Sequence, residues 1–279
     1  MKNLLIALTA VAAFSGSALA ADLPARTYTK APIVVPPPPS WTGCYIGGGG
    51  GYGLWDQENT NFDDTTIPRT QITATDSAGG RGWFGTVQAG CDYQFGAAGQ
   101  QFVIGAFGDY DFDSIKGSHE TPFLAGTAIT RAGIIPLIGD ATASEKMQNA
   151  WSIGGRAGWV VTPNLMTYIS GGYTQATFGS QSFFSNLAPG AALPFFLDKA
   201  TYNGWFLGAG DEYALNFLPG LFWKTEYRVS EYGTKTLPFL FTATGLPTGL
   251  SDDSHKWVQT VRSELVYRFN WGGPLVAKY

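Results

Sequence analysis

Hydrophobic and polar positions alternate with a period of two along most of the chain after residue 40. The pattern is clearest in residues 82–95 and 257–269, where odd positions are mostly apolar and even positions mostly polar. Alternation of this length exceeds that of an average globular strand. It matches a tilted strand that crosses a membrane, with apolar side chains facing lipid and polar side chains facing inward.

Eight stretches pass the same test, and we expect strands at residues 41–56, 80–95, 100–113, 147–162, 165–179, 201–217, 220–235 and 256–270. The connections alternate in length. Three are short turns, at Gly96–Gly99, Pro163-Asn164 and Leu218-Pro219, and four are long, at residues 57–79, 114–146, 180–200 and 236–255. Outer-membrane barrels have tight periplasmic turns and long external loops. The sequence therefore predicts an all-β fold: an eight-stranded antiparallel transmembrane up-and-down β-barrel.

The N-terminus has the features of an export signal. Lys2 supplies a positive charge, residues 4–14 are uncharged and apolar, and Ala18-Leu19-Ala20 forms a small-residue cleavage site. The apolar run is too short to span a bilayer. We therefore expect residues 1–20 to be a cleaved signal peptide.

The export signal and the strand pattern together predict a domain order and a location. Residues 21–40 include the run Pro36–Pro39 and are expected to form a Pro-rich periplasmic tether. The barrel is expected over residues 41–270, followed by a short C-terminal extension at 271–279. No later segment has the continuous apolar run of a membrane helix. The predicted location is the bacterial outer membrane.

Composition excludes several other classes of protein. Charged residues make up 14% of the chain, aromatic residues 15%, and the formal net charge is −4 without a cluster of Lys and Arg. Nucleic-acid binding, which needs a basic face, is not expected. Two Cys are too few for a disulfide framework or a tetrahedral cysteine metal site.

Aromatic residues gather at the expected strand ends, as in the two interfacial belts of a membrane protein. The expected periplasmic belt comprises Trp41, Phe95, Trp159, Phe217, Phe222, Phe269 and Trp271. The expected external belt comprises Trp55, Trp83, Phe178, Trp205, Tyr232 and Trp257.

Several short motifs resemble a known family: Tyr45–Gly48, Gly204-Trp205, Glu212–Ala214, Lys224–Arg228, Val261-Arg262 and Tyr267–Phe269. Over residues 41–270 the chain resembles the small outer-membrane barrels of alphaproteobacteria, the opacity-like, porin-family surface proteins of rhizobia and brucellae. The membrane domain of OmpA is similar in plan. The resemblance implies an abundant outer-membrane barrel with structural, immunogenic, adhesive or haem-binding roles. Unlike in OmpA, no peptidoglycan-binding domain is expected after the barrel.

The last expected strand resembles the signal that the barrel-assembly machinery reads. Leu265, Tyr267 and Phe269 share one face of this strand, and Phe269 stands near its end. Residues 271–279 leave open which aromatic residue is recognised. Expected partners are this machinery during biogenesis, and outer-membrane lipid and lipopolysaccharide afterwards.

Polar positions of the predicted strands would place eleven charges inside the barrel: Asp92, Asp109, Asp111, Arg156, Glu212, Lys224, Glu226, Arg228, Arg262, Glu264 and Arg268. Six acids and five bases are close to balance, as a closed ion-pair network requires. An eight-stranded interior is just wide enough to be filled by side chains. We therefore expect a structural plug, and an ion-selective pore is the alternative. Asp211 breaks the alternation, which predicts a bulge or a register error there.

Two cysteines are expected to form a structural disulfide. Cys44 lies near the periplasmic start of the first strand and Cys91 near the periplasmic end of the second, both on the outward register. Opposed residues of antiparallel neighbours come close enough to be bridged, and the periplasm is oxidising. No C-x-x-C arrangement is present to suggest a redox role.

Candidates for catalysis or cofactor binding are few. Ser118-His119 and Ser254-His255 both lie in expected external loops, and sequence neighbours do not supply the geometry of a catalytic pair. Residues 48–53 match G-x-G-x-x-G, but no helix follows to bind a phosphate. The glycines are instead expected to thin one barrel wall opposite bulky interior side chains. No enzyme activity, cofactor or metal site is expected, and an outer-membrane lipid-modifying enzyme is a remote alternative.

Three expected external loops contain unusually apolar stretches, at Ile134–Ile138, Leu193–Leu197 and Leu237–Phe241. We expect these loops to bury the stretches against one another over the barrel mouth. The alternative is an exposed apolar surface for a partner. The predicted function is structural support of the envelope and surface interaction, with a narrow porin for ions or small solutes as the alternative.

Overall fold

The computed structural model describes residues 39–122, 126–130, 133–137, 140–186 and 190–269, and all regular elements within them are β-strands. The predicted signal peptide, most of the predicted tether and the C-terminal extension lie outside the described residues. No helix in the described part of the chain is long and apolar enough to cross a membrane.

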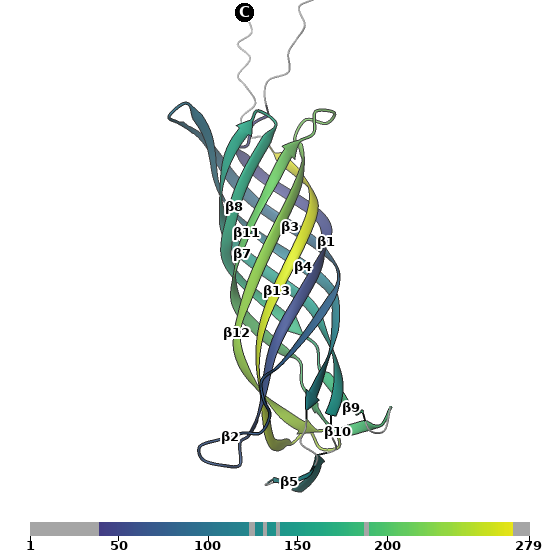
Figure 1. The fold of residues 1–279 in the computed structure, drawn as a ribbon. Helices are drawn as coiled ribbons and strands as arrows, with labels where there is room; N and C mark the ends of the chain where they lie inside the picture. The colour runs from purple at the N-terminus through teal and green to yellow at the C-terminus, as the bar shows by residue number, and fades with distance from the viewer. Residues whose placement is uncertain (1–38, 123–125, 131–132, 138–139, 187–189, 270–279) are drawn as a thin grey trace, which may run out of the picture. The chain divides into compact units, whose positions relative to one another are not determined.

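Eight long strands close into a ring (Figure 1). They are β1 (Gly43–Asp63), β3 (Asp76–Ala97), β4 (Gln100–Pro122), β7 (Asp140–Thr162), β8 (Leu165–Phe178), β11 (Ala200–Ala214), β12 (Leu221–Phe241) and β13 (Pro247–Phe269). Each pairs antiparallel with the next in this order, and β13 pairs with β1. The predicted eight-stranded antiparallel barrel is confirmed.

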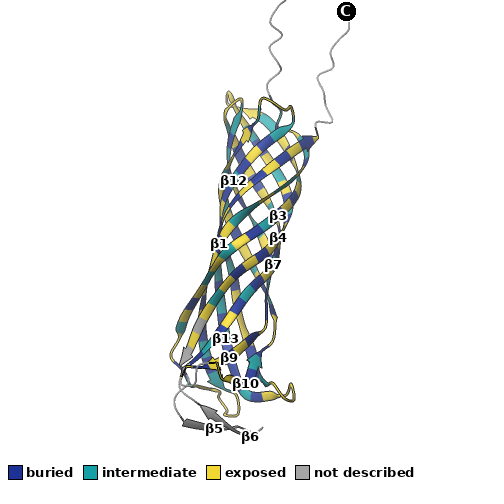
Figure 2. Cartoon of the chain, turned by 90° about the vertical axis from the view of Figure 1, so that its right-hand side faces the viewer, coloured by how far each residue is buried: buried dark blue, intermediate teal, exposed yellow. Residues whose placement is uncertain are grey.

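Side chains alternate between the interior and the outer surface, as the banding of the strands shows (Figure 2). On β13, the buried positions include Arg262, Glu264 and Arg268. The intervening Leu265 and Tyr267 are 53% and 43% exposed. The buried charges face inward and the outward positions between them are apolar, as in a barrel whose outer surface contacts lipid.

The short turns mark the periplasmic end of the barrel. Ala98 and Gly99, with φ of 50° and 77°, form a two-residue turn between β3 and β4. Pro163 and Asn164 join β7 to β8, and residues 215–220 join β11 to β12. The three predicted short turns are therefore found at their predicted places.

The strands continue further at the external end than the sequence predicts. Residues 57–63 extend β1, 114–122 extend β4, and 236–241 and 247–255 extend β12 and β13. The predicted fourth long loop is therefore wrong, because residues 242–246 alone separate the last two strands. Outside the bilayer, outward positions no longer need apolar residues, so the pattern that marks a membrane strand disappears while the backbone pairing continues.

Short strands add to the external end, opposite the short turns (Figure 1). Strand β2 (Thr70–Gln71) pairs with β1, and β9 (Gln181–Ser185) pairs with β7 and with β10 (Ala192–Leu197). Strand β10 also pairs with β12 at Phe239–Phe241. Strands β5 (Gly126–Thr130) and β6 (Gly133–Leu137) form a separate hairpin.

Two apolar clusters lie inside the ring, and glycines of β1 make room for them. A Cβ atom on Gly53 would lie 2.5 Å from Ile115 Cδ1, and one on Gly51 would lie 2.6 Å from Phe84 Cζ. These short distances support the expectation that glycine thins this wall opposite bulky side chains. The interior is packed with side chains at both ends.

The predicted aromatic belts need correction. Trp41, Phe222, Trp55, Phe178 and Tyr232 are all buried inside the barrel. Phe222, Trp55, Phe178 and Tyr232 occupy inward positions of their strands, and Trp41 lies two residues before β1. A position near a strand end does not reveal which face a residue occupies. Other predicted belt residues are exposed on the outer faces of their strands: Trp83, Trp159, Trp205 and Phe269. Phe217 is exposed in the turn at residues 215–220, and Trp271 lies outside the described residues.

Asp211 also differs from expectation. Its side chain is exposed on the outer surface, and β11 pairs in unbroken register there, with Thr167 on one side and Thr225 on the other. The predicted bulge or register error is therefore wrong. Asp211 lies near the periplasmic end of β11 at Ala214, where an outward carboxylate is close to the interface.

Candidate functional site: the charged interior of the barrel

All eleven charges that the sequence predicts to face inward are buried in the structure. They divide into two groups of alternating sign, which we call the four-charge ring and the seven-charge chain. The ring contains two acids and two bases, and the chain contains four acids and three bases. Together these groups account for every predicted inward charge.

The four-charge ring lies toward the periplasmic end and consists of Asp92, Arg156, Glu212 and Arg268. Arg156 donates from Nε to Asp92 Oδ1 at 3.0 Å and from Nη1 to Glu212 Oε2 at 2.9 Å. Arg268 donates from Nη1 to Asp92 Oδ2 and from Nη2 to Glu212 Oε1, both at 2.6 Å. Each guanidinium thus binds both carboxylates, and each carboxylate binds both guanidiniums.

Chain topology explains how the ring forms. Its members come from β3, β7, β11 and β13, which are alternate strands around the barrel. In closed barrels, alternate strands contribute inward side chains to the same layer. The four side chains are no more than 1% exposed, so their charges depend on one another for compensation.

Aromatic side chains surround the ring on the periplasmic side. The guanidinium carbons of Arg156 and Arg268 each lie 4.8 Å from the centre of the Tyr45 ring. Arg268 also lies 5.0 Å from the Phe222 ring and donates to the main-chain oxygen of Trp41 at 3.0 Å. These contacts combine cation–π attraction with exclusion of water.

The seven-charge chain crosses the middle of the barrel in the order Glu264, Lys224, Glu226, Arg228, Asp109, Arg262, Asp111. Its tightest contacts are made by Arg228, which donates to Glu226 Oε1 at 2.7 Å and to Asp109 Oδ2 at 2.9 Å. Arg262 donates to Asp111 Oδ2 at 3.0 Å. The Lys224 contacts to Glu226 and Glu264 are longer, at 3.6 and 3.7 Å.

The two ends of this chain are less completely satisfied than its centre. Both carboxylate oxygens of Glu264, Asp111 Oδ1 and Arg262 Nε are buried without a hydrogen bond to any described residue. Such atoms are uncommon in protein interiors. The middle layer is therefore more loosely bonded than the four-charge ring.

A third charged group, which the sequence analysis missed, lies at the external end. Lys256 donates to Glu145 Oε2 at 2.7 Å, and its ammonium lies 4.3 Å from the centre of the Phe178 ring and 5.2 Å from that of Trp55. Burial raises the pKa of nearby Asp252 to about 7, although Lys256 lowers it. Glu145 and Asp252 fall in stretches predicted as loops, but Lys256 shares the inward parity of Arg262 and Arg268.

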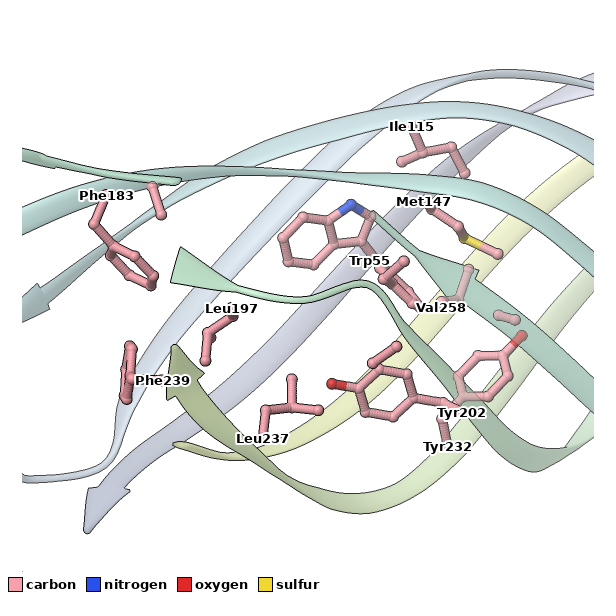
Figure 3. Close-up of a cluster of buried hydrophobic side chains, with 14 of the residues drawn as sticks. Trp55, Ile115, Met147, Phe183, Leu197, Tyr202, Tyr232, Leu237, Phe239 and Val258 are labelled. Carbon is pink, nitrogen blue, oxygen red and sulfur yellow. The ribbon is translucent and has the colours of Figure 1, made fainter. Parts of the chain in front are cut away.

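An apolar group closes the external end above this charged pair. The rings of Phe183, Phe195 and Phe239 have centres 5.5–5.6 Å apart. Phe183 and Phe239 lie on either side of the space next to Leu197 (Figure 3). Phe195 and Phe239 are 5% and 2% exposed. The expectation that the apolar loops bury one another is confirmed for Leu193–Leu197 and Leu237–Phe241. For Ile134–Ile138, Ile138 lies outside the described residues and the structure does not place the other side chains.

The predicted disulfide is confirmed. Cys44 of β1 and Cys91 of β3 are directly opposed in register and are bonded to each other. Cys91 is exposed and Cys44 half-buried on the outer surface, as the outward register predicts. The bond therefore links two neighbouring strands near the periplasmic end.

No catalytic Ser–His pair is assembled at Ser254 and His255. Ser254 is buried inside the barrel, whereas His255 is half-buried on the outer side, 3.3 Å from Glu231 Oε1. Successive strand residues face opposite sides, which separates the two groups. The structure does not place the side chain of His119. Within the described part of the chain, no three His, Cys, Asp or Glu residues are grouped as metal ligands.

Comparison with known proteins identifies the family. No profile of a known protein family matches the chain. The chain is 34% identical over 241 residues to the 31 kDa outer-membrane immunogenic protein of Brucella melitensis, covering 85% of this chain and 90% of that relative. The chain belongs to this family. The Brucella suis protein of the same name matches equally well.

Because the chain belongs to this family, it is a protein of the bacterial outer membrane. Its barrel is therefore in contact with membrane lipid. The name of the Brucella relatives describes an immunogenic protein of that membrane.

Solved structures of other barrels are only distantly similar. The protease OmpT of Escherichia coli matches with a TM-score of 0.41 and 9% identity, over 81% of this chain and 97% of that one. Neisserial surface protein A matches with a TM-score of 0.28 and 13% identity, over 78% and 97%. These similarities are too low to support an inference about activity.

Proposed function

We propose that this protein is a closed, non-enzymatic barrel that supports the outer membrane mechanically and presents its external strands at the cell surface. The four-charge ring carries the proposal. Two guanidiniums and two carboxylates meet from alternate strands, and Tyr45, Trp41 and Phe222 close the space around them. A passing ion would have to break these contacts and replace them with its own.

The closed external end supports the same function. Phe195 and Phe239 fill the mouth, and β9 and β10 connect β7 to β12 across it. With these side chains buried, an apolar binding surface formed by Phe195 and Phe239 is not supported. Surface partners would instead meet the polar outer faces of the extended strands and the connections at residues 64–69 and 242–246.

The narrow porin remains the second candidate, and one observation favours it. Buried polar atoms of Glu264, Asp111 and Arg262 lack hydrogen bonds to described residues, which suits a hydrated middle layer. An ion entering this layer would still have to pass the four-charge ring to reach the periplasm.

Complementation of a deletion strain tests the proposed role. Cells lacking the protein should admit a hydrophobic fluorescent dye and become sensitive to detergent, and the wild-type gene should restore both properties. A folded variant with changes confined to residues 242–246 is the matched control, because it keeps the barrel interior intact. Normal envelope resistance in the deletion strain would contradict a structural role.

A further inference from the structure

Three cationic side chains form a row across the outer face of β3, β4 and β7. In the strand registers, Arg81 is directly opposite Lys116, and Lys116 is directly opposite Lys146. Arg81 and Lys116 are exposed and Lys146 is half-buried. Directly opposed side chains lie about 5 Å apart at Cβ, and like charges in this arrangement are destabilising. An anion from outside the chain would therefore stabilise the row by compensating its three positive charges.

Nearby acids do not supply this anion. Glu145, next to Lys146 in sequence, faces inward and binds Lys256. Asp113 interacts electrostatically with Lys146, but its side chain is buried inside the barrel and does not reach the outer face. Asp56, diagonal to Arg81, accepts a hydrogen bond from the main-chain nitrogen of Gln57. Among the described residues, none forms an ion pair with the three cations.

A groove with a volume of about 600 Å³ adjoins two of these cations. The groove is lined by Lys116, Gly117, Ser118, Ser144, Glu145, Lys146, Gln148, Gly179 and Ser180. The carboxylate of Glu145 is buried inside the barrel against Lys256, so the charged side chains on the outer face of this lining are the two lysines. Ammonium, hydroxyl and amide groups all donate hydrogen bonds, and phosphate oxygens accept them. The lining therefore suits a phosphorylated group.

The row lies where the outer surface changes from aromatic to polar. Trp83 follows Arg81 on the outer face of β3 and is 71% exposed, and Phe112 on β4 is 59% exposed. Trp151 on β7 is 38% exposed. Exposed aromatic residues mark the membrane interface. The cations thus lie at the depth of lipid headgroups, at the external end of the barrel.

We propose that Arg81, Lys116 and Lys146 bind the phosphorylated headgroup of lipopolysaccharide in the outer leaflet. Three adjacent cations match a headgroup that carries several phosphate charges, whereas phosphatidylglycerol and phosphatidylethanolamine each carry a single phosphate. The acyl chains would follow the apolar outer face beside Trp83 and Phe112. The site would attach the barrel to the lipid that surrounds it.

The test titrates purified lipopolysaccharide into the refolded protein in a neutral detergent and follows both binding and thermal unfolding. A variant carrying Arg81→Gln, Lys116→Gln and Lys146→Gln should bind about tenfold more weakly or worse. A control carrying Arg69→Gln, Lys199→Gln and Lys235→Gln loses the same charge elsewhere and should bind like the wild type. Without lipopolysaccharide, the first variant should unfold at the same or a higher temperature than the wild type, because like-charge repulsion is removed.

Further arms of the experiment identify the ligand chemistry. Dephosphorylated lipopolysaccharide, phosphatidylglycerol micelles and inorganic phosphate should each bind much more weakly than intact lipopolysaccharide. Equal binding of wild type and the Arg81, Lys116 and Lys146 variant would overturn the site. Equal binding of phosphatidylglycerol or of dephosphorylated lipopolysaccharide would overturn its assignment to the lipopolysaccharide phosphates.

Discussion

Arg268 on the last strand donates a hydrogen bond to Asp92 at 2.6 Å, across 176 residues of sequence and over the intervening strand β1. The contact forms only when the ring of strands is closed, because β1 must pair with both β3 and β13 to place these residues in one layer. Arg268 and Asp92 thus connect barrel closure to the blocked interior.

Replacing Arg268 should strongly destabilise the barrel. Arg268→Met leaves Asp92 and Glu212 with Arg156 as their shared partner, and an undercompensated buried carboxylate costs about 3–5 kcal/mol. Urea unfolding in detergent micelles, followed by tryptophan fluorescence, measures the loss. Arg268→Lys keeps the charge but loses the forked geometry, so its loss should be smaller. Equal stability of Arg268→Met and wild type would contradict the role assigned to the ring.

Stability at the external end should depend on pH through Asp252. Its pKa is raised from 3.8 to about 7, with burial as the largest cause, and Glu145 and Asp253 raise it while Lys256 lowers it. The folded state therefore holds a proton that the unfolded state releases. The contribution of this proton to the free energy of unfolding is complete below about pH 4. It is lost as the pH rises to 7, by about 1.4 kcal/mol per pH unit.

Asp252→Asn isolates this effect, because the amide does not titrate. The difference in unfolding free energy between the variant and the wild type should grow between pH 4 and pH 7 and then level off. Urea unfolding at several pH values measures this difference, with Asp64→Asn as the control, because the side chain of Asp64 is exposed. A difference that does not change with pH would exclude Asp252 as the titrating group.

Removing the disulfide should lower stability without changing the fold. Cys44 and Cys91 close a loop with a sequence separation of 47, for which the chain-entropy model gives about 3–4 kcal/mol. The double variant Cys44→Ser, Cys91→Ser should unfold at a lower urea concentration. Reducing agent should shift the unfolding of the wild type but not of the variant. A shift in both proteins would show that the reductant acts elsewhere.

Truncating Phe239 should loosen the external end while leaving the membrane part intact. Phe239→Ala removes a buried ring that contacts Phe183 and Phe195, and such changes cost about 3–5 kcal/mol. Limited proteolysis should then cut the external strands faster. Phe184→Ala, which removes a 43% exposed ring from the same region, is the matched control. Unchanged proteolysis of Phe239→Ala would contradict the proposed closure.

The sequence predicted the membrane part of the barrel well and the external part poorly, for a physical reason. Inside the bilayer, lipid requires apolar residues at outward positions. The alternation of apolar Leu265 and Tyr267 with charged Glu264 and Arg268 therefore reveals both that the segment is a strand and which of its faces points inward. Beyond the bilayer both faces become polar, as at the inward Gln57 and the exposed Glu58, and the sequence of the strand resembles that of a loop. The inward charges could be predicted from parity, but their pairing could not, because Asp92 and Arg268 meet through barrel closure.

Planar-bilayer recording of the refolded protein tests the closed interior most directly. The wild type should be silent, whereas a charge-balanced variant with Arg156→Ser and Glu212→Ser should conduct in discrete steps, because it removes one base and one acid from the four-charge ring. Heat-modifiable migration on gels confirms that both proteins are folded. Reproducible conductance steps from the folded wild type would contradict the closed interior and favour the porin.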